Sequence, residues 1–189
     1  MRLFIGIPLA VGVAEELAAL AERLKSPSDG LRWSASAGWH ITLQFLGKTS
    51  MEQYACLVPG LRQIRFSPFT IQLEPPGFFD RAGVFFAGVG LSPQLIRLQE
   101  LVVAATGLCG FVPEDRPYHP HITLARTKGG RSALAALKPR IGDVKSFSGF
   151  TAREFLIYES FPGPGGSRYE KRDHFVLGEN QTNSENTSM

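Results

Sequence analysis

His40-Ile41-Thr42-Leu43 and His121-Ile122-Thr123-Leu124 are two copies of one tetrapeptide, 81 residues apart in a chain of 189. Together they use half of the chain's four histidines. Each copy sits at an equivalent point in one of two successive strand-and-helix patterns. The repeat therefore predicts an internal duplication in which each half of the chain supplies one copy.

Alternation along a β-strand indicates what each copy presents. Side chains of a strand point to opposite faces in turn, which places His40, Thr42 and Gln44 on one face. The second copy places His121 and Thr123 together in the same way. Each copy thus offers one imidazole and one hydroxyl, roughly 6–7 Å apart along the backbone. If a pseudo-twofold axis relates the halves, the two faces meet across a central groove.

Two imidazoles and two hydroxyls suit an in-line displacement at phosphorus. A neutral imidazole can take a proton from the attacking water while a protonated one gives a proton to the departing oxygen. The hydroxyls can hold the non-bridging phosphate oxygens. Imidazole fits both roles because its usual pKa lies near 6.5. The identical motifs leave open which histidine is the acid and which the base.

Two other interpretations compete with this one. A single His-x-Thr on a half-buried strand is usually structural, but two matched copies favour a shared site. His119 and His121 could together start a metal site on one strand face. No Asp or Glu stands beside either tetrapeptide, however, and a first shell is hard to complete. We therefore expect no metal and no cofactor, and we place His119 at the surface or the groove edge.

Composition sets the limits of the whole chain. The 20 Lys and Arg exceed the 17 Asp and Glu by three, and 43% of residues are hydrophobic. This is typical of a globular domain, and the small positive excess does not by itself indicate a polyanionic partner. We expect no membrane span and no signal peptide. Cys56 and Cys109 form no CxxC motif and are not expected to make a disulfide framework, which favours the cytoplasm.

Local signals predict alternating strands and helices. Ser50 to Gln53 matches a capping box, and Ser92-Pro93 a helix start that Gly107 would end. Residues 178–189 are rich in Asn, Ser and Thr and are expected to be a disordered tail after a single domain over 1–177. The expected strands are 3–7, 40–46, 69–73, 84–89, 121–125, 148–158 and 174–177, and the expected helices are 12–25, one from residue 51 that Pro59 shortens or kinks, 93–107 and 131–138.

The flanks of both tetrapeptides extend the pattern into a resemblance. Residues 39–47, with Arg32-Trp33 upstream, resemble the first signature of the 2H phosphoesterases, and residues 116–126 resemble the second. Residues 2–8, 156–160 and 167–169 also match. Within that superfamily the chain resembles the bacterial and archaeal RNA 2′,3′-cyclic phosphodiesterases, also called 2′–5′ RNA ligases.

This resemblance implies an α+β fold that is bilobal, with two pseudo-symmetric antiparallel-type sheets and outer helices around a central groove. It implies metal-independent hydrolysis of RNA 2′,3′-cyclic phosphodiester ends to 2′-phosphomonoesters. His40 would be the proton donor and His121 the proton acceptor, with Thr42, Thr123 and Arg126 binding phosphate. The implied partners are RNA ends or small 2′,3′-cyclic nucleotides, bound by a cytoplasmic monomer.

Some points stay open from the sequence. Strand alternation puts Arg126 on the face opposite His121 unless the strand ends or bulges at Ala125. Trp33, Phe45 and Tyr118 are candidates to stack on a base. We expect four arginines to gather near the groove: Arg32, Arg116, Arg126 and Arg168. Reversible 2′–5′ RNA ligation in the same site, or a phosphate-reading RNA-binding module without turnover, are the alternative functions.

Overall fold

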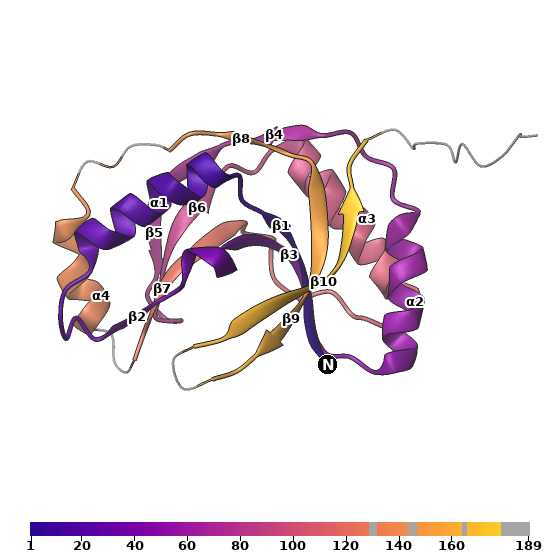
Figure 1. The fold of residues 1–189 in the computed structure, drawn as a ribbon, viewed down its shortest axis with the longest axis horizontal. Helices are drawn as coiled ribbons and strands as arrows, with labels where there is room; N and C mark the ends of the chain where they lie inside the picture. The colour runs from indigo at the N-terminus through magenta and orange to yellow at the C-terminus, as the bar shows by residue number, and fades with distance from the viewer. Residues whose placement is uncertain (129–131, 143, 145–146, 164–165, 179–189) are drawn as a thin grey trace, which may run out of the picture.

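The computed structural model describes residues 1–128, 132–142, 144, 147–163 and 166–178. These residues form two four-stranded sheets, one two-stranded sheet and four α-helices (Figure 1). In chain order the elements are β1 (Arg2–Pro8), α1 (Val11–Leu24), β2 (Leu31–Trp33), β3 (His40–Lys48), α2 (Met51–Arg62), β4 (Phe69–Ile71), β5 (Leu73–Phe79), β6 (Val84–Val89), α3 (Pro93–Gly107), β7 (His121–Thr127), α4 (Ser132–Leu137), β8 (Phe150–Ala152), β9 (Glu154–Phe161) and β10 (Arg168–Val176), with short 3-10 turns at Ser36–Gly38 and Lys138–Arg140.

The two larger sheets are built alike. The first has the strand order β10-β9-β1-β3 and the second β2-β7-β6-β5, with antiparallel pairing throughout the described strands. The inner order β9-β1-β3 corresponds to β5-β6-β7. The 81-residue spacing of the tetrapeptides also relates the first residues of α2 and α4, of β4 and β8, and of β5 and β9. The expected α+β class with two antiparallel sheets is confirmed.

The helices begin where the sequence predicts. The Ser50 side chain accepts from the Gln53 amide while the Gln53 side chain accepts from the Ser50 amide, which satisfies two free donors of α2. The Ser92 side chain caps α3 by accepting from the Leu95 amide, and α3 ends at Gly107. Pro59 does not end α2, which continues to Arg62.

The two halves interlock around one core. In Figure 1, α1 and α4 lie beside the strands of the second sheet, and α2 and α3 beside those of the first. Yet α3 follows β6 of the second sheet in sequence and packs against β3 of the first. The apolar faces of both sheets therefore join in a single hydrophobic cluster. Neither half has a core of its own.

Some predicted strands differ from those observed. The strand expected at 69–73 divides into β4 and the longer β5, and the strand at 148–158 divides into β8 and β9. This division lets β4 and β8 leave the larger sheets and pair with each other. The last strand begins earlier than predicted, and β2 was not predicted.

The expected tail at 178–189 lies, apart from Gly178, outside the described residues. No helix in the described part of the chain is long and apolar enough to cross a membrane.

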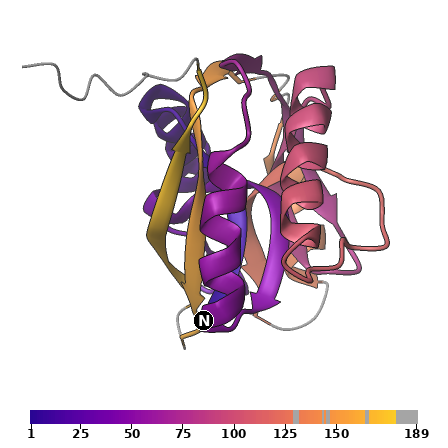
Figure 2. The same ribbon diagram turned by 90° about the vertical axis from the view of Figure 1, so that its right-hand side faces the viewer.

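The expectation for the cysteines is wrong. Cys56 in α2 and Cys109 just after α3 are joined by a disulfide, with Cα atoms 5.8 Å apart. The two helices pack together, as Figure 2 shows, and this packing brings together cysteines that are 53 residues apart in sequence. The argument for a reducing compartment from cysteine usage therefore loses its basis.

This crosslink predicts a measurable contribution to stability. Replacing both cysteines (Cys56→Ser with Cys109→Ser) should lower the free energy of unfolding by about 2–4 kcal/mol, because the unfolded chain regains the entropy that the closed loop removes. Denaturant unfolding with and without dithiothreitol measures this. The reductant should destabilise the parent and leave the double variant unchanged. Equal midpoints for the reduced and unreduced parent would contradict the prediction.

Candidate active site

A one-residue bulge in β7 decides which side chains share a face. Phe86 pairs with Thr123 and Phe85 pairs with Ala125, so Leu124 has no partner on β6. The extra residue shifts the alternation by one. Arg126, opposite Val84, therefore lies on the face of Thr123 and His121. Arg126 could share the face of His121 only if the strand ended or bulged near Ala125, and this bulge is present.

The equivalent bulge in β3 changes one expectation. Ile5 pairs with Gln44 and Gly6 with Thr42, which leaves Leu43 without a partner on β1. Gln44, expected beside His40, is instead buried and its side-chain oxygen accepts from the Thr106 hydroxyl at 2.7 Å. Phe45, rather than Gln44, therefore lies on the face of His40, and its side chain is 48% exposed.

The face of the first sheet that carries the motif is aromatic. His40 packs with ring-centroid distances of 4.4 Å to Phe4, 5.4 Å to Tyr158 and 5.2 Å to Tyr169. Phe4, Leu156, Tyr158 and Tyr169 form a hydrophobic cluster separate from the main core. Phe45 continues this face, since it pairs directly with Phe4. We call this the aromatic face. The continuous apolar run of residues 3–7 does not indicate that Phe4 leaves the core, and no local pattern places Tyr158 and Tyr169 beside His40.

The corresponding face of the second sheet is more cationic. His121 packs edge-on against Phe79, with ring centroids 4.9 Å apart, and lies 5.5 Å from Phe86. Arg126 lies farther along the same strand, and Arg32 of β2 pairs directly with it. We call this the cationic face. Because Phe45 and Arg126 are 81 residues apart in sequence, the two halves place an aromatic ring and a guanidinium at equivalent positions.

Both imidazoles are held in the same orientation. The Nδ1 atom of His40 lies 2.7 Å from the Gly38 carbonyl oxygen, and that of His121 lies 2.8 Å from the His119 carbonyl oxygen. A carbonyl only accepts, so Nδ1 must carry the hydrogen in each ring. Nε2 is therefore the atom of each ring that can accept or donate the transferred proton.

The two motifs lie close together. β3 and β7 are in contact, and the Tyr118 hydroxyl donates to the Thr42 carbonyl oxygen at 3.0 Å. Burial raises the pKa of Tyr118, so this hydroxyl keeps its proton and stays a donor. The charge of His121 contributes to the lowered pKa of His40.

Both histidines favour the neutral form in the free protein. Burial lowers the pKa of His40 to about 4, against the opposing effect of the bond to Gly38. Burial also lowers the pKa of His121, and nearby positive charges lower it further. The charges that act on His121 are those of His119, Arg126 and Arg116. The positive charges near His121 therefore favour the binding of an anion at this site.

The other residues expected at the site divide into two groups. Thr42 and Thr123 are half-buried beside their histidines, and His119 is exposed. Trp33 points away, packs on the main core and donates to Asp29 at 2.8 Å. Arg116 and Arg168 form ion pairs with Glu114 and Glu170.

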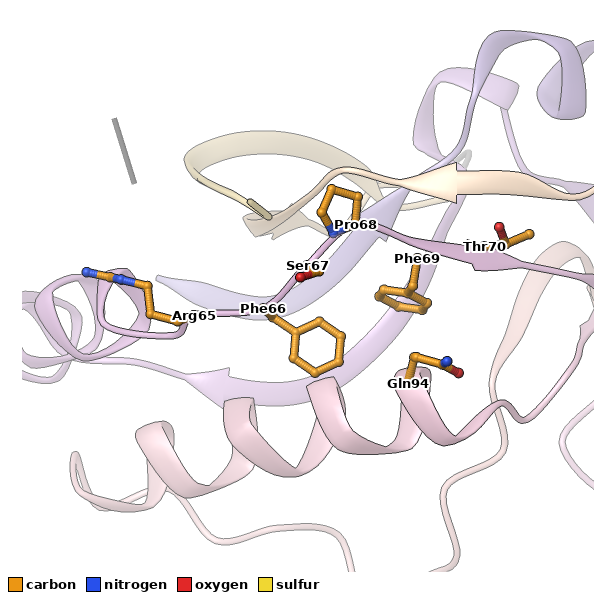
Figure 3. Close-up of a pocket in the computed structure, with 7 residues that line it drawn as sticks. All are labelled: Arg65, Phe66, Ser67, Pro68, Phe69, Thr70 and Gln94. Atoms are coloured by element: carbon orange, nitrogen blue, oxygen red, sulfur yellow. The ribbon is translucent and has the colours of Figure 1, made fainter. Parts of the chain in front are cut away.

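No three His, Cys, Asp or Glu side chains in the described ranges come together as a metal site would require. Metal-free chemistry stays a prediction. Figure 3 shows a depression elsewhere on the molecule, between the segment after α2 and the start of α3. Its lining contains neither β3 nor β7 residues, so it is separate from the paired histidines: Arg65, Phe66, Ser67, Pro68, Phe69, Thr70 and Gln94.

Two antiparallel sheets, each presenting one His-x-Thr from a bulged strand, define a phosphoesterase with paired histidines. A family model described as the 2′-5′ RNA ligase superfamily matches residues 13–160. The chain belongs to this superfamily.

Individual relatives agree with this assignment. The chain is 36% identical over 135 residues to the RNA 2′,3′-cyclic phosphodiesterase of Aeropyrum pernix, covering 68% of this chain and 77% of the relative. It is 31% identical over 177 residues to the protein of the same name from Escherichia coli K12, covering 93% and 96%. The solved structure of E. coli LigT complexed with 3′-AMP superimposes with a TM-score of 0.78 at 27% identity, covering 94% and 98%.

The burial of His40 predicts how stability depends on pH. Its folded-state pKa lies below the unfolded value near 6.5, so the unfolded chain binds more protons as the pH falls from 6.5 towards 4. The protein should lose up to about 2 kcal/mol of stability from this group between pH 7.5 and pH 5.

Chemical denaturation of His40→Gln at the two pH values measures this loss. The variant should lack the His40 part of the pH dependence, whereas His174→Gln, which changes an exposed histidine of β10, should behave like the parent. An undiminished pH dependence in His40→Gln would contradict the assignment.

Proposed function

We propose that this protein hydrolyses the 2′,3′-cyclic phosphate at RNA ends to a 2′-phosphomonoester. The observation that carries the proposal is the pair of imidazoles on adjoining strands, each with Nδ1 bound to a backbone carbonyl and Nε2 left to react. The curated relatives named RNA 2′,3′-cyclic phosphodiesterase support the choice of substrate. The 2′-oxygen that the reaction needs restricts the substrate to RNA.

The chemical step needs one proton acceptor and one proton donor. The Nε2 atom of His121 takes a proton from water as the water oxygen bonds to phosphorus. The bond from phosphorus to the 3′-oxygen breaks, and Nε2 of His40 gives that oxygen its proton. The hydroxyls of Thr42 and Thr123 donate to the non-bridging oxygens, and the Arg126 guanidinium balances their charge.

The lowered histidine pKa values fit a site in which His40 becomes protonated when the substrate binds. A cyclic phosphate carries one negative charge, and an adjacent negative charge raises the pKa of an imidazole. Substrate binding therefore favours the protonated form of His40, which the free protein disfavours. The burial that disfavours the charge in the empty site also excludes water, which strengthens the attraction once phosphate is bound.

The difference between the aromatic face and the cationic face favours one orientation of the bound nucleotide. Phe45 is an exposed ring next to Phe4, and a nucleobase can stack on it. The terminal base would then lie on the aromatic face, with the phosphate between the histidines. All these groups come from one chain, so we propose that the protein acts on RNA ends as a monomer.

The same site can join two RNA ends. If a 5′-hydroxyl replaces water as the nucleophile, His121 takes its proton, His40 protonates the departing 3′-oxygen and a 2′–5′ linkage forms; the two imidazoles exchange roles when that linkage is cleaved again. The description of the matching family as 2′-5′ RNA ligases favours this as a second activity.

The main test removes each histidine in the presence of EDTA. His40→Ala and His121→Ala should each reduce kcat on a 2′,3′-cyclic nucleotide by about 100-fold or more, because each removes one proton transfer. His174→Ala is the matched control and should keep full activity. Identification of the product as the 2′-phosphate completes the assay. RNA binding by the parent without turnover would favour the binding-module alternative.

The stacking role of Phe45 is tested with a substrate that lacks a base. Phe45→Ala should raise KM for a 2′,3′-cyclic nucleotide about 10-fold with little change in kcat, since stacking contributes about 1–3 kcal/mol. Phe45→Tyr should keep the parental KM. An abasic ribose 2′,3′-cyclic phosphate should bind the alanine variant and the parent equally. An equal loss on both substrates would mean that Phe45 does not contact the base.

A further inference from the structure

Arg32 is a guanidinium that the proposed hydrolysis does not use. It lies in the short strand β2, directly opposite Arg126 of β7. Its neighbours Leu31 and Trp33 pack on the main core, so alternation turns Arg32 to the other side, which is the cationic face. Arg32 and Arg126 therefore project from the same face on adjacent strands.

Two like charges in this position are unfavourable by themselves. Side chains directly opposite each other in an antiparallel pair have Cβ atoms about 4.5–5.5 Å apart, and like charges there destabilise the sheet. Within the described part of the chain neither arginine forms an ion pair, whereas Arg116 and Arg168 do. An anion bound between Arg32 and Arg126 would remove this repulsion.

Asp29, a carboxylate three residues before Arg32 in sequence, has other partners. The side-chain oxygens of Asp29 accept from the amides of Ser26 and Leu31 and from the Trp33 indole. These bonds hold the segment that leads into β2 and leave Asp29 bonded to the backbone and to Trp33 rather than to Arg32. The Arg32 stem is also confined, because a Cβ atom added to Gly166 would lie 3.4 Å from its Cδ. Gly166 belongs to the turn between β9 and β10, so Arg32 sits where the two sheets approach each other.

The two arginines lie on different strands relative to His121. Arg126 is near enough to His121 for its charge to lower the pKa of that imidazole. Arg32 is one strand farther towards the edge of the sheet. An RNA end whose terminal phosphate meets Arg126 carries its next phosphate on the 5′ side of the same ribose.

We propose that Arg32, beside Arg126, binds the phosphodiester that precedes the terminal nucleotide, while Arg126 faces the terminal phosphate. Arg32 is thus a specificity-determining residue that makes the enzyme favour cyclic phosphates on an RNA chain over free 2′,3′-cyclic mononucleotides. This inference rests on the proposed hydrolysis and adds to it a second phosphate subsite.

Three substrates separate the two phosphates. The first is a 2′,3′-cyclic mononucleotide with a free 5′-hydroxyl, which has only the reacting phosphate. The second is a dinucleotide with the same 2′,3′-cyclic end, which adds one charged linkage. The third is that dinucleotide with an uncharged methylphosphonate linkage. The parent should show a kcat/KM about 10-fold higher on the charged dinucleotide than on the other two.

Substitution of Arg32 should remove only this preference. Arg32→Gln should lose about 10-fold in kcat/KM on the charged dinucleotide and stay within twofold of the parent on the other two substrates. Its dependence of log KM on log salt should be shallower by about one unit, as expected when one phosphate contact is lost. Arg32→Lys should restore part of the preference, and Arg97→Gln, which changes an exposed arginine of α3, should leave it intact.

Each outcome bears on one proposal or the other. Equal losses on all three substrates, or no loss on any, would overturn the second subsite. A parent that shows no preference for the charged dinucleotide would overturn it as well. A parent that turns over none of the substrates would overturn the proposed hydrolysis itself. Thermal unfolding of Arg32→Gln distinguishes a lost contact from a lost fold.

Discussion

The site depends on a single irregularity in strand pairing that occurs twice. Without the unpaired Leu124, alternation would bury Arg126 and expose Ala125, and the second sheet would offer an imidazole and a hydroxyl but no guanidinium. The same irregularity at Leu43 buries Gln44 and exposes Phe45. The unpaired residue that follows the threonine in each strand thus gives each motif a third side chain. The histidine and threonine precede the bulge, so their own placement does not depend on it.

The duplicated architecture carries an unequal chemistry. Both halves hold a histidine by Nδ1 against a carbonyl two residues earlier, and both place a phenylalanine of the neighbouring strand beside it. The two halves differ in the residues around the histidine: tyrosines and Phe45 surround His40, and arginines lie near His121. Equal imidazoles in unequal surroundings are what a reaction with one acid and one base requires, because a strictly symmetric site would give both rings the same pKa.

The strands that carry the repeated motif and the helix caps could be predicted from the sequence, because each is determined by residues close together in the chain. The fate of Gln44 could not be predicted, since a bulge is a property of the pairing with β1 rather than of β3 alone. The pairing of Cys56 with Cys109 depends on helices from different halves packing together, and no spacing rule anticipates it. The environment of His40 was missed for a related reason: Tyr158 and Tyr169 reach it from strands more than 100 residues later in the chain.

The place of β1 in the first sheet has a consequence for how the protein is made. Of the strands in this sheet, β1 is the first to be synthesised, yet it lies between β3 and β9, and Leu3 pairs with Glu159. Residue 159 must leave the ribosome before the sheet can close, and Tyr169 must follow before the wall around His40 is complete. The site therefore cannot assemble before these later strands have been synthesised, and contacts so distant in sequence also form slowly. An interrupted translation product would thus carry the first histidine motif without the surroundings that give it a function.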